Sequence, residues 1–287
     1  MPSKQDLRRR IRSVRSTQQL TRAMKMVYAA KLRRSQAAVA EARPYAAALG
    51  GVLRSLAGRV GGSRHPLLVE RAERSVTLVV VAGDKGLCGA FNTNILREAA
   101  VLMRSGRWEQ VEIVLVGRRA VDFARRRGLA AVAAYPELMK RVTAEGSREV
   151  ARLVTERYGN SRTDAVYLLY NRFRSILQQE VTLERLLPIA RVEGEAGAPA
   201  AGTIFEPSPQ ALLGEILPRH VEFQVFRALL DSQAAEHAAR MTAMDAASNN
   251  AEDMIDRLTL TYNRARQASI TKELIEIVSG AQALAER

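Results

Sequence analysis

The sequence contains one cysteine, Cys88, in 287 residues, and few aromatic residues. A single thiol excludes an internal disulfide framework and a zinc site built from several thiolates, and it fits a reducing compartment. Aromatic residues make up 5% of the chain, with one Trp. Ala and Arg are plentiful instead, and both are among the best helix formers. This composition favours long helices packed through small and aliphatic side chains.

Long hydrophobic runs are also missing. No apolar run approaches the roughly 20 residues needed to cross a bilayer. The N-terminal residues MPSKQDLRRRIRSVRS have no apolar stretch behind them, which excludes a secretory signal. They are Arg-rich like a transit peptide, but their pattern continues into a long helix, which argues against one. Apolar residues at 47% and charged residues at 26% exclude wholesale disorder.

Acidic residues are scarce in one terminal segment. Residues 1–36 hold 11 Lys and Arg against one acid, Asp6, whereas residues 207–287 hold 8 basic and 11 acidic residues. The net charge of +14 therefore belongs largely to the N-terminal segment. This asymmetry predicts an anionic partner for that segment rather than non-specific binding of anions over the whole surface.

The N-terminal residues 1–57 are expected to form one long helix. Gly is absent before Gly50 and Pro44 is the only internal proline. Some 55 residues make a helix of roughly 80 Å, and Pro44 is the position at which a bend is expected. Its apolar or small side chains recur at three- and four-residue steps and form a single predicted stripe: Leu7, Ile11, Val14, Thr17, Leu20, Met24 and Val27.

Residues 207–287 return to a helical period, and Pro218 is expected to kink or restart that helix near its base. Alternating steps of four and three over five heptads predict a left-handed coiled coil. The predicted seam residues are Leu230, Ala234, His237, Met241, Met244, Ser248, Ala251, Ile255, Leu258, Tyr262, Ala265 and Ser269. The N-terminal helix is the expected partner. The C-terminal helix is longer, so its apolar end, Leu274–Ala281, should extend beyond the pair and need a cover.

Residues 58–206 change character and predict an α/β domain. Three continuous apolar runs read as buried parallel strands, at Ser75–Ala82, Val111–Gly117 and Asp164–Phe173, with an edge strand at Val181–Ile189. Helices are predicted between them at Asn92–Arg104, Arg118–Arg127 and Glu137–Tyr158. The expected fold is therefore a long antiparallel coiled coil of both termini with an inserted three-layer, Rossmann-like α/β domain. Two stretches read as loops, Gly58–Pro66 and the flexible Glu193–Gly202.

The turn Gly83–Gly89 follows a strand and precedes a helix, where phosphate-binding loops lie. It has neither a Gly-Lys-Ser/Thr ending nor G-x-G-x-x-G spacing. We therefore interpret it as a tight turn whose glycines adopt positive φ. The alternative is an α/β nucleotide-binding enzyme with helical oligomerisation arms, which nucleotide titration would detect.

Other candidates for catalysis or metal binding are weak. Cys88 has no CxxC partner, so we interpret it as a packed side chain. The histidines His65, His220 and His237 lack metal-ligand spacing, and His237 falls in the predicted seam. No turn glycine accompanies the acidic side chains on the C-terminal helix, so a solvated face is favoured over a cation site. These acids are Glu252, Asp253 and Asp256.

The basic run of the N-terminal helix has three interpretations. A nucleic-acid patch has the charge, but aromatic residues are not interleaved with it. A solvated face is ordinary, except that compensating acids are nearly absent. We favour a protein-binding face steered to acidic loops of a partner. A nucleic-acid-binding coiled coil stays as a further alternative that salt-dependent DNA retention would support.

Three stretches carry a family resemblance. They are Ser16–Gln36 (STQQLTRAMKMVYAAKLRRSQ), Asp84–Asn94 (DKGLCGAFNTN) and Glu236–Ala283, which begins EHAARMTAMDAASNN. In these motifs and in their order along the whole chain, the sequence resembles the gamma subunit of bacterial F-type ATP synthases, the rotating central stalk. Tyr28 departs from the family's pattern, which usually has a small residue there. The chain lacks the cysteine-bearing regulatory insertion of the chloroplast type.

The resemblance implies a non-catalytic subunit of a proton-translocating complex, with no cofactor of its own. It implies partners in three alpha and three beta subunits, an epsilon subunit and the membrane c-ring, but no nucleic acid. Rotation would couple proton flow to ATP synthesis or hydrolysis at beta and would regulate ATPase activity. The implied location is peripheral, on the cytoplasmic face of the bacterial inner membrane.

The resemblance also assigns contact residues. The implied stator contacts are Met24, Arg266, Gln267 and Thr271. The foot around Leu212–Phe223 is implied to contact the rotor ring and epsilon. The basic helix would face acidic loops of the catalytic subunits through Arg8, Arg9, Arg12, Arg33 and Arg34.

Overall fold

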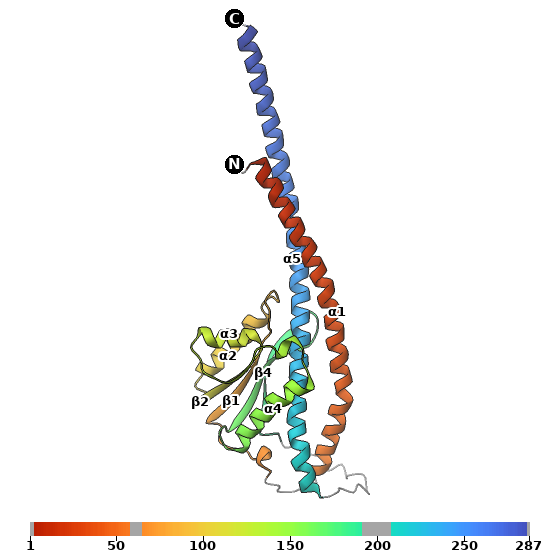
Figure 1. The fold of residues 1–287 in the computed structure, drawn as a ribbon, viewed down its shortest axis with the longest axis vertical. Helices are drawn as coiled ribbons and strands as arrows, with labels where there is room; N and C mark the ends of the chain where they lie inside the picture. The colour runs from red at the N-terminus through yellow and green to blue at the C-terminus, as the bar shows by residue number, and fades with distance from the viewer. Residues whose placement is uncertain (1–2, 58–64, 191–207, 286–287) are drawn as a thin grey trace. The chain divides into compact units, whose positions relative to one another are not determined.

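The computed structural model describes residues 3–57, 65–190 and 208–285. The chain divides into two compact units, one of Met1–Val27 with Met241–Arg287 and the other of Tyr28–Arg240. Two long helices, α1 (Lys4–Ala57) and α5 (Pro209–Ala285), contribute residues to both units (Figure 1). The sequence-based division at residues 57 and 206 stays a prediction. Of the two predicted loops, Glu193–Gly202 lies outside the described residues, and so does most of Gly58–Pro66.

In the first unit, α1 and α5 pair in opposite directions. Lys25 bonds to Asp245, Arg22 to Glu252 and Lys4 to Ser269, so residue numbers rise on one helix as they fall on the other. All predicted α5 seam residues of this unit, from Met241 to Ser269, are buried or half-buried. The predicted antiparallel coiled coil is confirmed.

The second unit contains a five-stranded sheet in the order β3-β2-β1-β4-β5. Its strands are β1 (Ser75–Val81), β2 (Gln110–Val116), β3 (Ala131–Tyr135), β4 (Ala165–Phe173) and β5 (Gln179–Leu187). The first four are mutually parallel, whereas β5 pairs antiparallel with β4 as the predicted edge strand. Parallel neighbours bury both faces, which explains the continuous apolar runs in β1 and β4.

Helices cover both faces of this sheet. Val76, Leu78 and Val80 of β1 pack with α2 (Phe91–Arg104) and α3 (Arg118–Arg126). The alternate residues Val79 and Val81 pack with α4 (Ala144–Gly159) and with Leu217–Leu229 of α5. Because strand side chains alternate between faces, one run of valines serves both cores. The predicted three-layer arrangement is confirmed (Figure 1).

One local prediction in this unit was wrong, and one strand was missed. The segment Glu137–Tyr158 is not one helix: the short 3-10 helix η2 (Leu138–Lys140) precedes α4, and Thr143 caps α4 by accepting a hydrogen bond from Gly146 N. An N-cap threonine favours a new helix start at this point. The strand β3 was not predicted. The 3-10 helix η1 (Pro66–Leu68) completes the described elements.

The long helices run through their prolines. Pro44 lies inside α1 and Pro218 inside α5, so the C-terminal helix does not restart at Pro218. Within the described residues, none of the helices is both long and apolar enough to cross a bilayer.

The predicted stripe of α1 was wrong in part. Leu20 and Val27 are 61% and 52% exposed, and Thr17 is exposed as well. The residues that face α5 in this unit follow a strict heptad instead: Leu7, Ile11, Val14, Gln18, Thr21 and Lys25 are buried or half-buried. Three of these are polar, and each has a partner on α5.

Candidate functional site: the helix pair and the turn after β1

The seam of the helix pair contains a buried pair of hydroxyl groups. Thr21 Oγ1 and Ser248 Oγ lie 2.8 Å apart, and the two residues are 7% and 4% exposed. Thr21 Oγ1 also donates to the carbonyl of Gln18 at 3.0 Å. Small side chains allow the two backbones to approach closely, and the hydroxyl bond satisfies polar groups that burial would otherwise penalise. The seam is therefore not uniformly apolar, and its buried hydroxyl pair favours this one alignment of the two helices.

Ion pairs flank the seam. Lys25 Nζ lies 2.6 Å from Asp245 Oδ1, and Arg22 Nη2 lies 3.0 Å from Glu252 Oε2. Both pairs are about half exposed, so each contributes at most about 1 kcal/mol. Their main effect is to set the register of the two helices. Glu252, one of the acids weighed as a cation site, is engaged in this pairing through Arg22 and Gln18.

Pairing in this unit extends to the first turn of α1. Lys4 Nζ donates to Ser269 Oγ at 2.8 Å, and Arg8 donates to the Tyr262 hydroxyl at 2.8 Å with its guanidinium over the ring. Beyond this point every α5 residue from Ile270 to Ser279 is exposed. Four apolar side chains of this end are 56–68% exposed: Leu274, Ile275, Ile277 and Val278.

The predicted stator residues lie at two levels of the helix pair. Arg266, Gln267 and Thr271 are exposed on α5 close to the level of Lys4. Met24 is half-buried on α1 near the level of Asp245, about 20 residues or roughly 30 Å further along α5. The structure therefore groups Arg266, Gln267 and Thr271 on one segment and keeps Met24 apart. Exposed Leu20 and Val27 flank Met24 on α1.

All five arginines of the predicted partner-facing basic helix are exposed: Arg8, Arg9, Arg12, Arg33 and Arg34. Arg8 is used within the chain by Tyr262. Arg33 and Arg34 belong to the second unit. In the predicted foot, Leu213, Leu217 and Val221 are buried in the core of the second unit, which leaves Glu215 and Arg219 exposed.

The turn after β1 is closed by a buried ion pair from α5. Arg240 Nη2 lies 2.6 Å from Glu236 Oε1, with side-chain exposures of 3% and 7%. Arg240 also donates to the carbonyls of Gly86 at 3.1 Å and Lys85 at 3.2 Å. The Glu236 carboxylate lies against Gly83, where an added Cβ would be 2.8 Å from its Cδ. These contacts fasten the strand-to-helix turn to α5.

Burial shifts the pKa values of this cluster in known directions. Desolvation raises the pKa of Glu236, and the nearby Arg240 guanidinium opposes that shift. Desolvation lowers the pKa of His237 to about 4, assisted by the positive charges of Arg240 and Lys31. The ring of His237 lies 5.7 Å from Tyr28, and Arg240 stacks on the same Tyr28 ring at 4.7 Å. The bulky Tyr28 is thus part of the packing around the ion pair.

This geometry opposes a nucleotide site at Gly83–Gly89. The Glu236 carboxylate at Gly83 would repel phosphate, and Arg240 already uses two carbonyls of the turn. Positive φ occurs at Leu87 and Gly89 rather than at Gly83 or Gly86, so the predicted role of the glycines was only partly right. Cys88 is 2% exposed, and burial raises the pKa of its thiol, which disfavours a nucleophilic thiolate.

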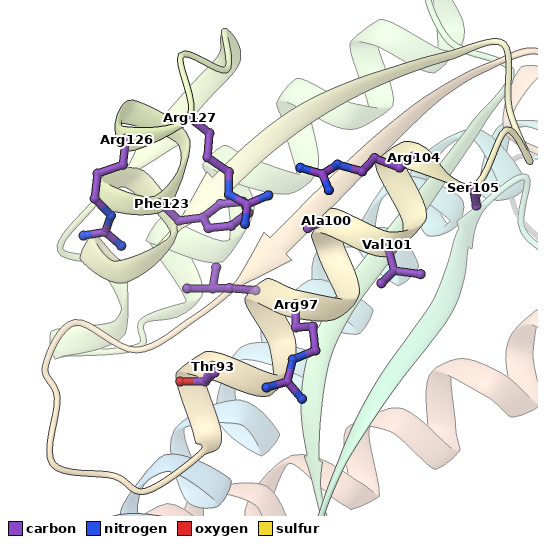
Figure 2. Close-up of a pocket in the computed structure, with 10 residues that line it drawn as sticks. Thr93, Arg97, Ala100, Val101, Arg104, Ser105, Phe123, Arg126 and Arg127 are labelled. Carbon is purple, nitrogen blue, oxygen red and sulfur yellow. The ribbon is translucent and has the colours of Figure 1, made fainter.

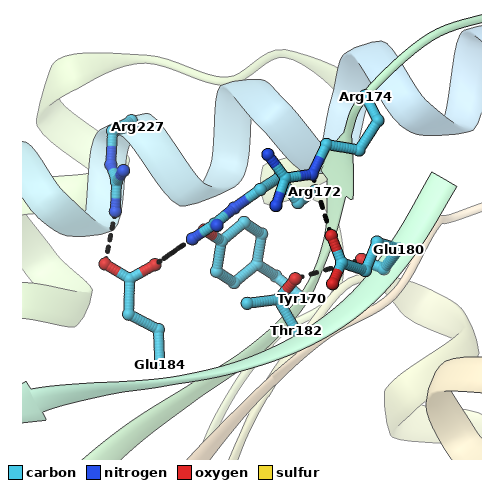
Figure 3. Close-up of polar contacts among 7 residues, drawn as sticks. All are labelled: Tyr170, Arg172, Arg174, Glu180, Thr182, Glu184 and Arg227. Carbon is cyan, nitrogen blue, oxygen red and sulfur yellow. Dashed lines mark hydrogen bonds and ion pairs between the residues drawn. The ribbon is translucent and has the colours of Figure 1, made fainter.

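Within the described ranges, no three His, Cys, Asp or Glu side chains are grouped as a metal site would require. A second polar network instead joins the edge of the sheet to α5 (Figure 3). Glu184 of β5 accepts from Tyr170 at 2.7 Å and from Arg172 at 3.0 Å, and it pairs with Arg227 of α5. Burial and the Glu184 carboxylate raise the pKa of Tyr170 to about 12.

Sequence reasoning did not predict a role for Glu236 or Arg240. Their i, i+4 spacing is the available signal, since it places opposite charges one turn apart on a helix. The same spacing is common on solvated faces, and only the turn packed against it shows that this pair is buried.

Comparisons with known proteins agree with this architecture. The family model described as ATP synthase matches residues 3–284. The ATP synthase gamma chain of Pelotomaculum thermopropionicum is 49% identical over 284 residues, covering 99% of this chain and 100% of the relative. That of Chloroherpeton thalassium is 45% identical over 99% of both chains.

Solved structures are similar in fold. A chain of the central stalk/c-ring structure of the Tetrahymena thermophila mitochondrial ATP synthase matches with a TM-score of 0.60 and 25% identity, covering 80% of this chain and 99% of that one. A chain of the Euglena gracilis mitochondrial ATP synthase matches with a TM-score of 0.67 and 21% identity, covering 98% and 94%. With the family model and close relatives spanning the whole chain, this protein belongs to the family of ATP synthase gamma chains.

Proposed function

We propose that this chain is the rotary central stalk of an F-type ATP synthase and itself performs no bond chemistry. Its partners are three alpha and three beta subunits, an epsilon subunit and the membrane c-ring. Turning of the helix pair couples proton flow through that ring to ATP synthesis or hydrolysis at beta. The chain lies peripherally, on the cytoplasmic face of the bacterial inner membrane.

The observation that carries the proposal is the uncovered end of α5. Leu274, Ile275 and Ile277 are 57–68% exposed, beyond the last bond to α1. An apolar helix end of this kind requires a cover from another protein. A sleeve of surrounding alpha and beta subunits supplies one and leaves the end free to turn.

The mechanism follows from the asymmetry of the helix pair. At one level its surface presents the exposed Leu20 and Val27 of α1, whereas at another it presents Arg266 and Gln267 of α5. Three equivalent beta subunits around such a shaft meet different faces at any angle. A contact that favours one conformation of a subunit shifts its population, so rotation cycles the three catalytic sites through different states.

The assigned contacts give the test. In a complex reconstituted with Arg266→Ala, we expect about fivefold less assembled enzyme or ATP-driven proton pumping, because a hot-spot contact is worth about 1 kcal/mol or more. Arg264→Ala is the matched control, since Arg264 is also an exposed arginine of α5, two positions before Arg266. Equal assembly and pumping in the two variants would remove Arg266 from the stator contacts. ATP hydrolysis by the isolated chain would favour the enzyme alternative instead.

A further inference from the structure

The outer face of the α/β unit carries a basic groove that the stalk function does not use. It lies between α2 and α3, on the sheet face opposite α4, and has a volume of about 710 Å³ (Figure 2). That volume is within the usual range for small-molecule sites. Its lining residues are Thr93, Leu96, Arg97, Ala100, Val101, Arg104, Ser105, Phe123, Arg126 and Arg127.

Four of the ten lining residues are arginines and none is an acid. Figure 2 shows Arg104, from the last turn of α2, extending toward α3, while Arg127 at the end of α3 extends back over Phe123. The Arg127 guanidinium lies 4.6 Å from the centre of the Phe123 ring. In the described part of the chain, Arg97, Arg104 and Arg126 form no ion pair with a carboxylate.

The helix dipole explains the position of only some of these arginines. A positive side chain at a helix C-terminus is stabilised by the helix dipole, which suits Arg104 and Arg126. Arg97 lies in the middle of α2, where that effect is absent. The neighbouring Arg125 is neutralised in the usual way, by an ion pair with Asp122 at 2.7 Å. The arginines of the groove instead lie close to one another, and their positive charges repel each other. A bound anion would relieve this repulsion.

The chemistry of the groove matches a phosphate chain. Guanidinium groups bind phosphate through paired, charge-assisted hydrogen bonds, and several around one space suit several phosphates. The hydroxyl group of Thr93 lies on α2, and the exposed Val101 and the Phe123 ring give apolar surface for a flat ring. We propose that this groove binds an oligophosphate chain, carried by a nucleotide or by inorganic polyphosphate. The site is independent of the stalk function.

Calorimetric titration of the full chain with ATP, tripolyphosphate and adenosine tests the proposal. We expect saturable binding of ATP and tripolyphosphate that weakens with salt, and none of adenosine. Tighter binding of ATP than of tripolyphosphate would identify a nucleotide as the source, whereas equal binding would identify the phosphate chain alone. Arg104→Gln and Arg127→Gln should each weaken binding about tenfold, because each removes charge-assisted hydrogen bonds.

Arg125→Gln is the matched control and should change affinity less than about twofold, because Arg125 is already paired with Asp122. Val101→Glu, which adds a carboxylate in the groove at a position 53% exposed, should abolish binding without touching an arginine. The proposal is overturned if neither triphosphate binds, if the Arg104→Gln/Arg127→Gln double variant binds like the wild type, or if hexaglutamate binds more tightly than tripolyphosphate. The last result would make the groove a docking surface for an acidic peptide.

Discussion

Arg240 and Glu236 form an ion pair one helical turn apart in α5, 2.6 Å between Nη2 and Oε1, with both side chains at least nine-tenths buried. The remaining donors of Arg240 reach the carbonyls of Lys85 and Gly86. A buried pair is stable only when such further hydrogen bonds offset the loss of hydration. The pair therefore depends on the turn after β1, and the turn on the pair.

Glu236→Gln should destabilise the chain strongly. The substitution leaves the Arg240 charge buried without its partner, which costs roughly 3–5 kcal/mol. Urea unfolding followed by circular dichroism measures the change in the free energy of unfolding. Glu252→Gln is the control, because the Arg22–Glu252 pair is 57% exposed on both sides and should cost less than about 1 kcal/mol. Equal losses in the two variants would show that burial of the pair contributes nothing.

The sequence was sufficient to predict the layers and the helix pair but not the seam of α1. Hydrophobicity alone selected Leu20 and Val27, which are exposed, over Gln18 and Thr21, which face α5. Polar residues belong in a seam only when a partner satisfies them, and that partner lies more than 220 residues away. The seam of α5 was predicted correctly because most of its heptad positions hold apolar residues, such as Met244, Ile255 and Leu258, so hydrophobicity and period select the same residues.

Two other features depend on tertiary contacts in the same way. The strand β3 has the sequence AVAAY, which has little intrinsic preference for a strand, and its pairing with β2 decides its structure. Gly83 reads as a turn glycine, whereas the structure requires a small residue because Glu236 lies against it. Neither contact leaves a periodic signal in the chain.

Gly117→Ala should cost more stability than Gly106→Ala. Both glycines have positive φ, at 88° and 67°, so an added Cβ strains either backbone by about 1–2 kcal/mol. At Gly117 the Cβ would also lie 1.9 Å from the carbonyl oxygen of Ala82, whereas nothing lies within 4 Å at Gly106. The difference between the two free energies of unfolding isolates the collision. We expect it to exceed about 2 kcal/mol, and similar values would mean that the β1 end moves aside without cost.

His237 should make stability fall in mild acid. Burial lowers its pKa in the folded chain to about 4 from 6.5, so the unfolded chain binds the proton more readily. The stability is fully present above pH 6.5 and is lost as pH falls toward 4. Between pH 7.5 and pH 5 the loss from this group is about 2 kcal/mol.

The measurement compares the wild type with His237→Gln, which cannot titrate. Because carboxylates and the other histidines are common to both chains, the difference between their unfolding free energies isolates His237. That difference should change by about 2 kcal/mol between pH 7.5 and pH 5. A difference that stays constant over this range would place the folded pKa of His237 near its ordinary value.

Thr21 and Ser248 should be energetically coupled across the seam. Thr21→Val keeps the shape but removes the 2.8 Å partner of the Ser248 hydroxyl, which then depends on its longer 3.4 Å bond to the Gln18 carbonyl, at a cost of about 1 kcal/mol. Ser248→Ala does the converse. Removing both hydroxyls leaves no orphaned group, so the double variant should lose less than the sum of the single losses, by about 1 kcal/mol. Thr17→Val is the control, because that exposed hydroxyl donates to the Ser13 carbonyl of its own helix. Additive losses in the double variant would show that each hydroxyl is satisfied by its bond to the Gln18 carbonyl, 3.0 Å from Thr21 Oγ1 and 3.4 Å from Ser248 Oγ.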